Sequence, residues 1–207
     1  MKLKVKNLIK KFKSTTAVND ISFEVEKNST MGLLGPNGCG KTTSIGMMLG
    51  LITPSSGQIY IDDLILNSNN RIELLSLMNF ASPYIELPKK LTVKQNLEVY
   101  ARLYGVENIQ ERIYEMIEDL GLQKLLEKKT GELSSGQKNR VALAKSLINK
   151  PKLLFLDEPT ASLDPDVGDF VREYIEKYKK INEVTIILAS HNMKEVERLC
   201  NRIIMMK

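Results

Sequence analysis

The sequence predicts an α/β fold with a mostly parallel core sheet, and three observations support this prediction. A short apolar segment, residues 30–35, leads into a glycine-rich turn that opens a helical pattern. Two continuous apolar runs, residues 152–157 and 183–190, have the character of parallel strands that are covered on both faces. Between these features, residues 92–126 repeat apolar side chains every three or four positions, which predicts a helical segment inserted into the core.

The first part of the chain alternates between strand and helix signals. Residues 2–8 and 17–26 alternate apolar with polar side chains, as half-buried strands do. After the buried strand at 30–35, a helix is expected from Thr42 to Leu51, and residues 57–63 return as a strand. This order places the glycine-rich turn between a strand and a helix.

The middle and the end of the chain continue this pattern. Residues 93–105 and 109–121 each show helical periodicity and end at a glycine, where helices often stop. A helical crossover is expected from Val167 to Lys180, because parallel strands need such a connection. Residues 201–207 are expected to form a further strand.

Composition narrows the class of protein. With 207 residues and 43% apolar content, the chain can support a substantial core. The net charge of +5 comes from scattered lysines that are not gathered with aromatic residues, so solvated faces are favoured over a nucleic-acid surface. Cys39 and Cys200 lack paired spacing, which indicates a reducing compartment and no disulfide framework. No run approaches about 18 apolar residues, so no membrane-spanning helix is predicted.

The segment from Gly35 to Thr42, GPNGCGKT, fits the pattern G-x-x-x-x-G-K-[ST] of a phosphate-binding loop. Its glycines let successive backbone N–H groups point at phosphates, while the Lys41 ammonium supplies a point charge and the Thr42 hydroxyl suits Mg²⁺. A glycine-rich turn that merely caps a helix is the alternative. The flanking strand and helix favour the phosphate loop.

Acidic and imidazole side chains follow the two apolar runs. Asp157 and Glu158 end the first run at the carboxyl edge of the sheet, where α/β folds bind ligands. We expect Asp157 to hold the Mg²⁺ shell and Glu158 to polarise a water for attack on a γ-phosphate. His191 leaves the second run at the same edge, where a ring N–H could reach that phosphate. The non-catalytic alternatives are an acidic strand end before Pro159 and a partnered structural histidine.

A second anion site is indicated by LSSGQKNR, Leu133 to Arg140. Two serines and a glycine stand directly before a helical pattern, and a helix start offers free N–H groups and a positive dipole end. Taken by itself, this stretch is either a helix cap or half of a larger site.

Together these motifs resemble those of the ATP-binding subunits of ABC transporters. GPNGCGKT, LSSGQ, LLFLDEP, SLD and His191 follow one another in the order and approximate spacing of that family, and the likeness covers nearly the whole chain. Other phosphate-loop enzymes share the first and third motifs but lack LSSGQ. The resemblance implies a P-loop NTPase fold with an N-terminal antiparallel β subdomain, in one ABC ATPase domain over 1–207. Its α/β core would take about 1–85 and 151–207, and a helical subdomain about 86–150.

The resemblance also implies roles for individual positions. Lys41, Glu158 and His191 would be catalytic, and Thr42 and Asp157 would hold Mg²⁺. Phe12 matches the aromatic residue that stacks on adenine, with a strand residue that covers the core as a fair competitor. In the family, one subunit binds ATP on its phosphate loop, and the other subunit contacts the same ATP through its signature segment, LSSGQ, and the loop that contains SLD. The positions that match the first set are Phe12, Gly35, Pro36, Asn37, Gly38, Cys39, Gly40, Lys41, Thr42 and Thr43. The positions that match the contacts in trans are Ser134, Ser135, Gly136, Gln137 and Asp164.

One departure from the family pattern concerns a glutamine. The family usually places it near what are here Ser82 and Pro83, but NFASPYIELP contains none, and Gln95 comes too late in the chain. That glutamine normally touches Mg²⁺ or the attacking water where the membrane partner docks. We therefore expect hydrolysis to persist, with a modified contact to the partner.

Cys39 occupies a variable position of the loop, where a residue that simply fits is favoured over a redox role.

The leading hypothesis is an ATP-binding and ATP-hydrolysing subunit that dimerises around two Mg-ATP and drives transport, in export rather than import, by separate membrane subunits. The expected partners are transmembrane permease subunits and a second ATPase subunit, in a homodimer or pseudo-dimer, without nucleic acid. The expected place is the cytoplasmic face of the cell membrane. One alternative is an ABC-type ATPase that acts on nucleic acid or ribosomes. Such proteins carry long insertions or a second cassette, and this sequence shows neither feature. The other, a regulator, leaves the hydrolytic residues unexplained.

Overall fold

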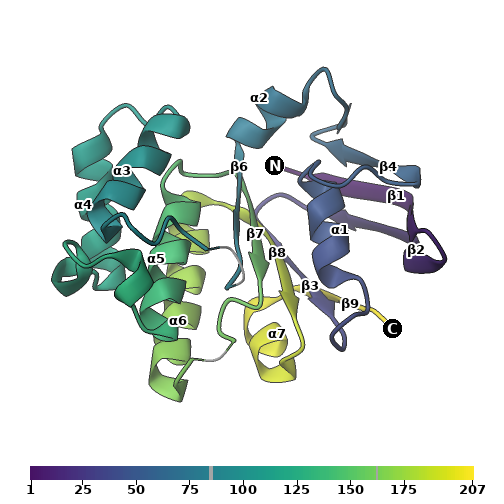
Figure 1. Cartoon of the computed structure of the whole chain (residues 1–207). Helices are drawn as coiled ribbons and strands as arrows, with labels where there is room; N and C mark the ends of the chain where they lie inside the picture. Colours follow the sequence, from purple (N-terminus) through teal and green to yellow (C-terminus); the bar gives the residue numbers. More distant parts are fainter. Residues whose placement is uncertain (84–85, 162) are drawn as a thin grey trace.

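The computed structural model describes residues 1–83, 86–161 and 163–207, and its strands form an antiparallel and a parallel sheet (Figure 1). The antiparallel sheet has the order β2-β1-β4-β5, and the parallel sheet has the order β6-β7-β8-β3-β9. The strands are β1 (Leu3–Phe12), β2 (Thr15–Val25), β3 (Thr30–Leu34), β4 (Ser56–Ile61), β5 (Leu64–Ile65), β6 (Met78–Ala81), β7 (Leu153–Asp157), β8 (Thr185–Ser190) and β9 (Arg202–Met205).

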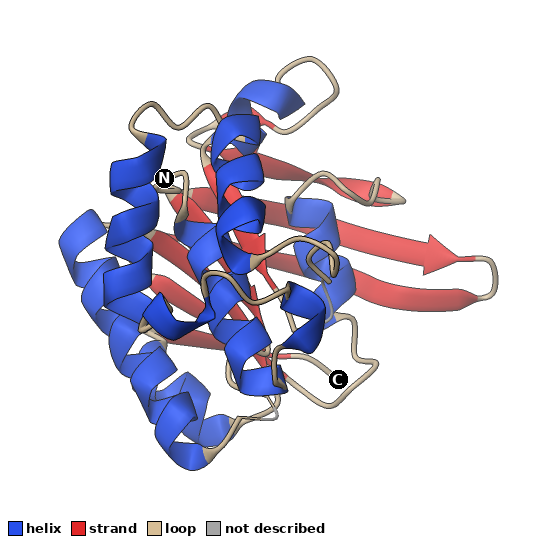
Figure 2. Cartoon of the chain, turned by 60° about the vertical axis from the view of Figure 1, so that its left-hand side comes forward, coloured by secondary structure: helices blue, strands red, loops and turns tan. Residues whose placement is uncertain are grey.

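The helices divide between the two faces of the parallel sheet. Helix α1 lies between the two sheets and contacts β2, β7 and β8, while α3 to α6 gather on the opposite side (Figures 1 and 2). The α-helices are α1 (Lys41–Met48), α2 (Arg71–Ser76), α3 (Val93–Leu103), α4 (Ile109–Leu120), α5 (Ser135–Leu147), α6 (Pro165–Asn182) and α7 (Met193–Leu199), and 3-10 turns cover Gln123–Leu125 and Thr130–Glu132.

Strand β7 shows why its sequence is a continuous apolar run. Successive side chains of a strand point to opposite faces, and both faces of this sheet are covered. Leu154 and Leu156 enter the core beneath α3 to α6, whereas Leu153 and Phe155 enter the core shared with α1 and the antiparallel sheet. The prediction of a central parallel strand covered on both faces is confirmed.

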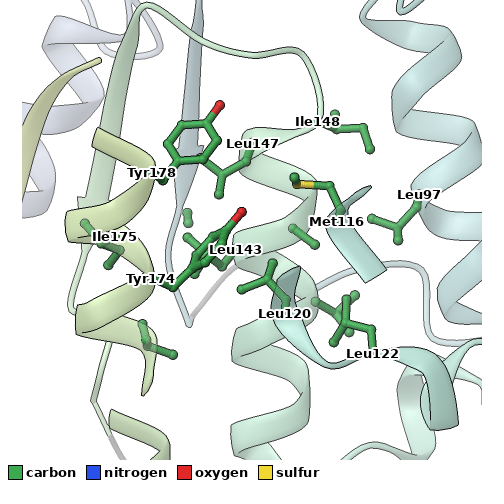
Figure 3. Close-up of a cluster of buried hydrophobic side chains, with 14 of the residues drawn as sticks. Leu97, Met116, Leu120, Leu122, Leu143, Leu147, Ile148, Tyr174, Ile175 and Tyr178 are labelled. Atoms are coloured by element: carbon green, nitrogen blue, oxygen red, sulfur yellow. The ribbon is translucent and has the colours of Figure 1, made fainter. Parts of the chain in front are cut away.

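The core on the helical side is built from aliphatic side chains and two tyrosines that project from α6 (Figure 3). Helix α4 supplies Leu120, α5 supplies Leu143 and Leu147, and α3 adds Leu97. The residues labelled in the close-up are Leu97, Met116, Leu120, Leu122, Leu143, Leu147, Ile148, Tyr174, Ile175 and Tyr178. Because this cluster also contains residues of β7 and β8, the inserted helices and the sheet share one core.

The fold class predicted from the sequence is confirmed, and the differences are local. The helix after the glycine-rich turn ends at Met48 rather than Leu51, because Gly50 adopts a left-handed conformation with φ of 63°. The crossover helix begins at Pro165, which suits the first helical turn since it lacks an N–H donor. The elements α2, α7, β5 and β6 were not expected and are short. The limits of 86 and 150 for the helical subdomain stay a prediction.

A polar network joins the helices to the edge of the parallel sheet. The Lys145 ammonium of α5 donates to the Asn79 Oδ1 atom of β6 at 3.1 Å and lies over the rings of Tyr100 and Tyr104. Asn79 in turn donates to Asn149 Oδ1 at 2.9 Å. Burial lowers the pKa of Lys145 to about 8, because a desolvated ammonium is costly. Across the described residues, no helix has the length and apolar character needed to cross a bilayer.

The depressed pKa of Lys145 predicts a pH-dependent stability. The unfolded chain holds this proton up to its ordinary pKa of 10.5, whereas the folded chain releases it near pH 8. The folding penalty is therefore fully present below pH 8 and is relieved between pH 8 and 10.5. In urea unfolding, the free energy of unfolding of the native protein should rise in this window relative to that of Lys145→Met. Lys138→Met, at an exposed lysine of the same helix, should follow the native protein instead.

Candidate nucleotide-binding site

The glycine-rich loop lies between β3 and α1, at the carboxyl edge of the parallel sheet. Glycine is required sterically at two of its positions. A Cβ atom on Gly40 would stand 2.2 Å from the Ala17 carbonyl oxygen, and one on Gly35 would stand 2.4 Å from the Met206 carbonyl oxygen. Gly38 is in open space but has φ of 86°, a conformation that side chains disfavour. The sequence of the loop is thus dictated by close backbone contacts and by its left-handed turns.

Lys41, the first residue of α1, is folded into the loop. Its ammonium donates to the carbonyl oxygens of Gly35 at 2.6 Å and of Pro36 at 3.0 Å, and it lies 3.9 Å from Glu158 Oε1. The side chain is buried although it carries a charge. A buried ammonium that is held by carbonyl oxygens can be exchanged for stronger anionic partners, so the loop is prepared to receive phosphate oxygens.

A hydroxyl group and a carboxyl group lie together beside the loop. The Thr42 hydroxyl donates to Asp157 Oδ2 at 2.8 Å, which joins the start of α1 to the end of β7. Asp157 is buried, and desolvation raises its pKa, opposed by the Thr42 hydrogen bond. A nearby cation would favour the charged form of this carboxyl group.

Glu158 and His191 meet at the same edge. Glu158 has φ of 52°, a strained value for a residue with a side chain, and its N–H donates to the Ala189 carbonyl oxygen at 2.8 Å. This turn brings Glu158 Oε1 to 2.8 Å from His191 Nδ1, while the Ser190 hydroxyl lies 3.4 Å from Oε2. The Glu158 side chain is buried, but that of His191 is 56% exposed. The pair therefore joins an interior carboxylate to a ring that faces solvent.

Lys41, Thr42, Asp157 and Glu158 line one cavity of about 270 Å³, whereas His191 reaches its edge only through the contact with Glu158. Its walls come from β2, the loop, α1 and the end of β7, and the lining residues are Ala17, Asn37, Gly38, Gly40, Lys41, Thr42, Thr43, Asp157 and Glu158. The structure thus brings most of the predicted loop residues and both acidic residues together. Sequence reasoning missed Ala17, because only tertiary packing carries β2 to the loop. It also missed Ser190, although its place directly before His191 was a usable signal.

The segment LSSGQ begins helix α5 as a capping box. The Ser134 hydroxyl accepts from the Gln137 N–H at 3.3 Å, and Gln137 Oε1 accepts from the Ser134 N–H at 3.1 Å. Ser134 and Ser135 are exposed and lie outside the lining of the loop cavity. The interpretation as a helix cap is confirmed, and the S-x-x-Q spacing alone would have predicted the reciprocal bonds. A role toward a second subunit stays a prediction.

A model of the protein family described as ABC transporter matches residues 18–161, which is more than half of the chain. The chain belongs to the ABC transporter family. The match runs from Val18 in β2, through the phosphate loop and LSSGQ, to the residues directly after Glu158. It therefore contains both anion-binding segments that the sequence suggested.

Relatives within this family carry names of ATP-binding proteins. The chain is 37% identical to the Nod factor export ATP-binding protein I of Rhizobium sp. (strain N33), over 94% of this chain and 64% of that protein. It is 35% identical to the linearmycin resistance ATP-binding protein LnrL of Bacillus subtilis (strain 168), over 97% of this chain and 65% of that protein. It is 34% identical to the ABC transporter ATP-binding protein NatA of the same strain, over 94% of this chain and 80% of that protein. The chain thus spans only about two thirds of the length of the first two relatives.

Solved structures of ABC proteins share the whole fold. A dimeric structure of a bacterial ABC transporter cassette has a TM-score of 0.91 at 25% identity and covers 99% of this chain and 94% of that one. CbiO1 from Clostridium perfringens, part of the ABC transporter complex cbiONQ, has a TM-score of 0.85 at 30% identity. The similarity covers 99% of this chain and 84% of that one. These similarities confirm the ABC ATPase fold.

Phe12, at the end of β1, is the predicted nucleotide-binding residue whose position differs most from the prediction. It is 46% exposed, and the Lys10 ammonium lies 4.8 Å from the centre of its ring. Within the described residues it is not part of the cavity lining. An exposed ring above a hairpin does not cover the core, which disfavours the purely structural alternative. Its role in adenine stacking stays a prediction.

Other family positions lie on connecting segments. Asp164 is exposed at the N-cap of α6, where its side chain makes no capping hydrogen bond, and Ser162 of SLD lies outside the described residues. Ser82 is buried and, with Pro83, lines a second cavity of about 380 Å³ beside the start of α5. Gln95 cannot replace the missing glutamine, because its Oε1 accepts from the Thr92 N–H at 2.9 Å and caps α3.

The capping box predicts an asymmetry between two adjacent serines of the ABC signature segment. Ser134→Ala removes the cap of α5 and should lower the free energy of unfolding by about 1 kcal/mol in chemical denaturation. Ser135→Ala should change it by less, since Ser135 is exposed and is already helical. Equal effects of the two substitutions would show that the cap contributes nothing specific.

Proposed function

We propose that this chain is the ATP-binding and ATP-hydrolysing subunit of an ABC transporter, which acts as a dimer on partner membrane subunits. The observation that carries the proposal is the placement of Glu158, whose carboxylate lies 2.8 Å from His191 Nδ1 and 3.9 Å from the Lys41 ammonium at the phosphate-loop cavity. A buried carboxylate between a solvent-facing imidazole and a phosphate-binding lysine suits the activation of a water molecule.

Triphosphate binding would fall to the loop from Gly35 to Thr43. Backbone N–H groups at the start of α1 provide donors and a positive dipole end for the phosphate oxygens. Lys41 would exchange the carbonyl oxygens of Gly35 and Pro36 for the terminal phosphates, which are stronger acceptors. Phe12 would stack on the adenine. Pro36, Asn37 and Cys39 complete the loop without a polar role of their own in this proposal.

Thr42 and Asp157 fit a Mg²⁺ ion. They provide a hydroxyl and a carboxylate oxygen 2.8 Å apart on the cavity wall, and burial raises the pKa of the carboxyl group, so a bound cation would stabilise its charged form. No cluster of three or more His, Cys, Asp or Glu side chains occurs in the described part of the chain. Two protein oxygens suffice for Mg²⁺, because phosphates and waters usually complete its shell. Bound there, the ion would neutralise charge on the phosphate oxygens.

Glu158 would act as the general base. Its carboxylate accepts a proton from the attacking water, and the neighbouring Lys41 ammonium offsets the charge on the phosphates. His191 Nδ1 holds one carboxylate oxygen in place, so the exposed ring can present its other nitrogen to the γ-phosphate. The strained backbone of Glu158 fixes the direction of this side chain before the nucleotide arrives.

A second subunit would complete the site. The proposed contributors to the nucleotide of the other subunit are Ser134, Ser135, Gly136 and Gln137 at the start of α5, with Asp164 before α6. This part of the proposal is supported by the exposure of both serines and by the dimeric structure of the related cassette. A homodimer is the simplest assembly, and a related subunit could provide the second half equally well.

The proposed partners are transmembrane permease subunits, and the proposed place is the cytoplasmic face of the cell membrane. The resemblance implies a permease contact near Ser82 and Pro83, which line the second cavity, and without the usual glutamine that contact would be modified. Export is favoured over import, since the names of two relatives refer to Nod factor export and to linearmycin resistance. No nucleic acid is expected as a partner.

The general-base role predicts the effect of one substitution. Glu158→Gln should lower the steady-state rate of ATP hydrolysis by about 100-fold or more, because the amide cannot accept the proton. ATP affinity, measured with a fluorescent nucleotide, should stay within about threefold. Glu183→Gln is the matched control, since Glu183 also has a positive φ, of 51°, but caps α6 at the surface. Equal hydrolysis rates of the native protein and Glu158→Gln would contradict the proposal.

The trans role of the signature segment predicts a separation of binding from turnover. In Ser134→Arg, the isolated subunit should still bind ATP with native affinity, because Ser134 lies outside the lining of its own cavity. The variant should no longer form a dimer with ATP, as measured by size-exclusion chromatography, and it should no longer hydrolyse ATP. Loss of ATP binding in the monomer would show instead that the segment serves its own nucleotide.

A further inference from the structure

Behind the proposed base lies a second buried carboxyl group, that of Glu195 in α7, to which the reaction described above gives no role. Glu195 is 1% exposed, and burial raises its pKa. Its Oε1 accepts a hydrogen bond from the Thr160 hydroxyl at 2.6 Å. A carboxyl group so deeply buried destabilises a fold unless its partners compensate, so the contacts that it keeps are informative.

Ser190 connects this carboxyl group to Glu158. Its side chain is completely buried, and its hydroxyl lies 3.4 Å from Glu158 Oε2 and close enough to Glu195 to lower the pKa of that carboxyl group. The same oxygen accepts from the Asn192 N–H at 3.0 Å, which fixes the orientation of the hydroxyl. The Ser190 hydroxyl therefore lies near both carboxyl groups, so a displacement of one carboxyl group would be felt at the other.

Thr160 connects Glu195 to the segment that leads from Glu158 toward Asp164. Its hydroxyl donates to Glu195 and accepts from Arg172 Nη1 of α6 at 3.3 Å. Backbone bonds keep this segment close to the base, since the Ala161 N–H donates to the Glu158 carbonyl oxygen at 3.0 Å. Glu195 thus holds two segments at once, the one that follows the base and the one that carries His191.

Capping of α7 does not explain this carboxyl group. The side chain that caps the helix is that of Asn192, which accepts from the Glu195 N–H at 3.4 Å. The Glu195 carboxyl group points away from this cap toward Thr160 and Ser190. Its contacts lead to the proposed active site, whereas the neighbouring Glu197 on the same helix is exposed.

We propose that Glu195 is a positioning residue for the Glu158–His191 pair and acts through the hydroxyls of Ser190 and Thr160. The inference rests on the proposed function for its effect on hydrolysis, but not for its effect on the geometry of the pair. Glu195 itself touches neither the nucleotide-binding cavity nor the reacting atoms. Its removal should misplace the base rather than weaken nucleotide binding.

The geometry can be tested without any turnover, because His191 is the only histidine in the sequence. Selective ¹³C/¹⁵N labelling of histidine gives one set of ring resonances in NMR, which report on the contact with Glu158. Glu158→Gln, as the positive control, should shift these resonances. Glu195→Ala and Ser190→Ala should shift them too, while Glu195→Gln, whose amide can still bond both hydroxyls, should leave them near their native positions. Glu197→Ala is the control that should cause no shift.

Hydrolysis provides the second readout. Glu195→Ala should lower kcat by roughly 10- to 100-fold, since a displacement of about 1 Å in a catalytic group can cost that much, with KM for ATP within about twofold of native. Glu195→Gln should recover most of kcat, and Glu197→Ala should match the native protein. Ser190→Ala combined with Glu195→Ala should be little slower than Glu195→Ala alone, because both act along one route.

The outcomes separate the inference from the function on which it rests. If Glu158→Gln hydrolyses ATP at the native rate, the proposed function fails, and the NMR comparison still decides whether Glu195 positions the pair. If Glu195→Ala leaves the His191 resonances unchanged, the positioning role is wrong. The role is also wrong if Glu195→Gln is as impaired in kcat as Glu195→Ala, or if the alanine variant raises KM without changing kcat.

Discussion

The hydrogen bond between the Thr42 hydroxyl and the Asp157 carboxylate joins the two segments on which the rest of the site depends. One partner lies at the start of α1 after the glycine-rich loop, and the other is the last residue of β7, an interior strand of the parallel sheet. Because β7 pairs with β6 and β8, this contact sets the loop against the sheet edge that also carries His191. The two cores on either side of the sheet hold that edge rigid, and rigidity is what a preorganised polar site requires.

Burial of charge is the main cost of this arrangement. Lys41, Asp157, Glu158 and Glu195 are all nearly inaccessible to water within one region of the molecule. Each would destabilise the fold if it stood without a partner, and each has at least one strong hydrogen bond. Fully connected buried networks rigidify their surroundings, so the same contacts that offset desolvation also restrict the directions in which these side chains can point.

Much of the fold and of the candidate site could be predicted from the sequence. The apolar runs that became β7 and β8, and the loop between β3 and α1, carry strong local signals. Short elements such as α2 and β6 carry weak ones, since four to six residues give little periodicity. Ala17 and Thr160 became visible only through tertiary contacts, because no pattern along the chain links either residue to the group it touches. Phe12 shows the converse, since its resemblance to a family position did not bring it into the cavity lining.

The capping box at the start of α5 also has a consequence for chemical selectivity. The Ser134 hydroxyl oxygen accepts from the Gln137 N–H, so the proton of this hydroxyl can still be donated to another molecule. The side-chain oxygen of Gln137 already accepts from the Ser134 N–H. Backbone N–H groups at a helix start are likewise donors. The exposed tip therefore offers protons but few lone pairs. It can bind a group that only accepts hydrogen bonds, such as a fully ionised phosphate. It provides few acceptor atoms for an ammonium group or a metal cation.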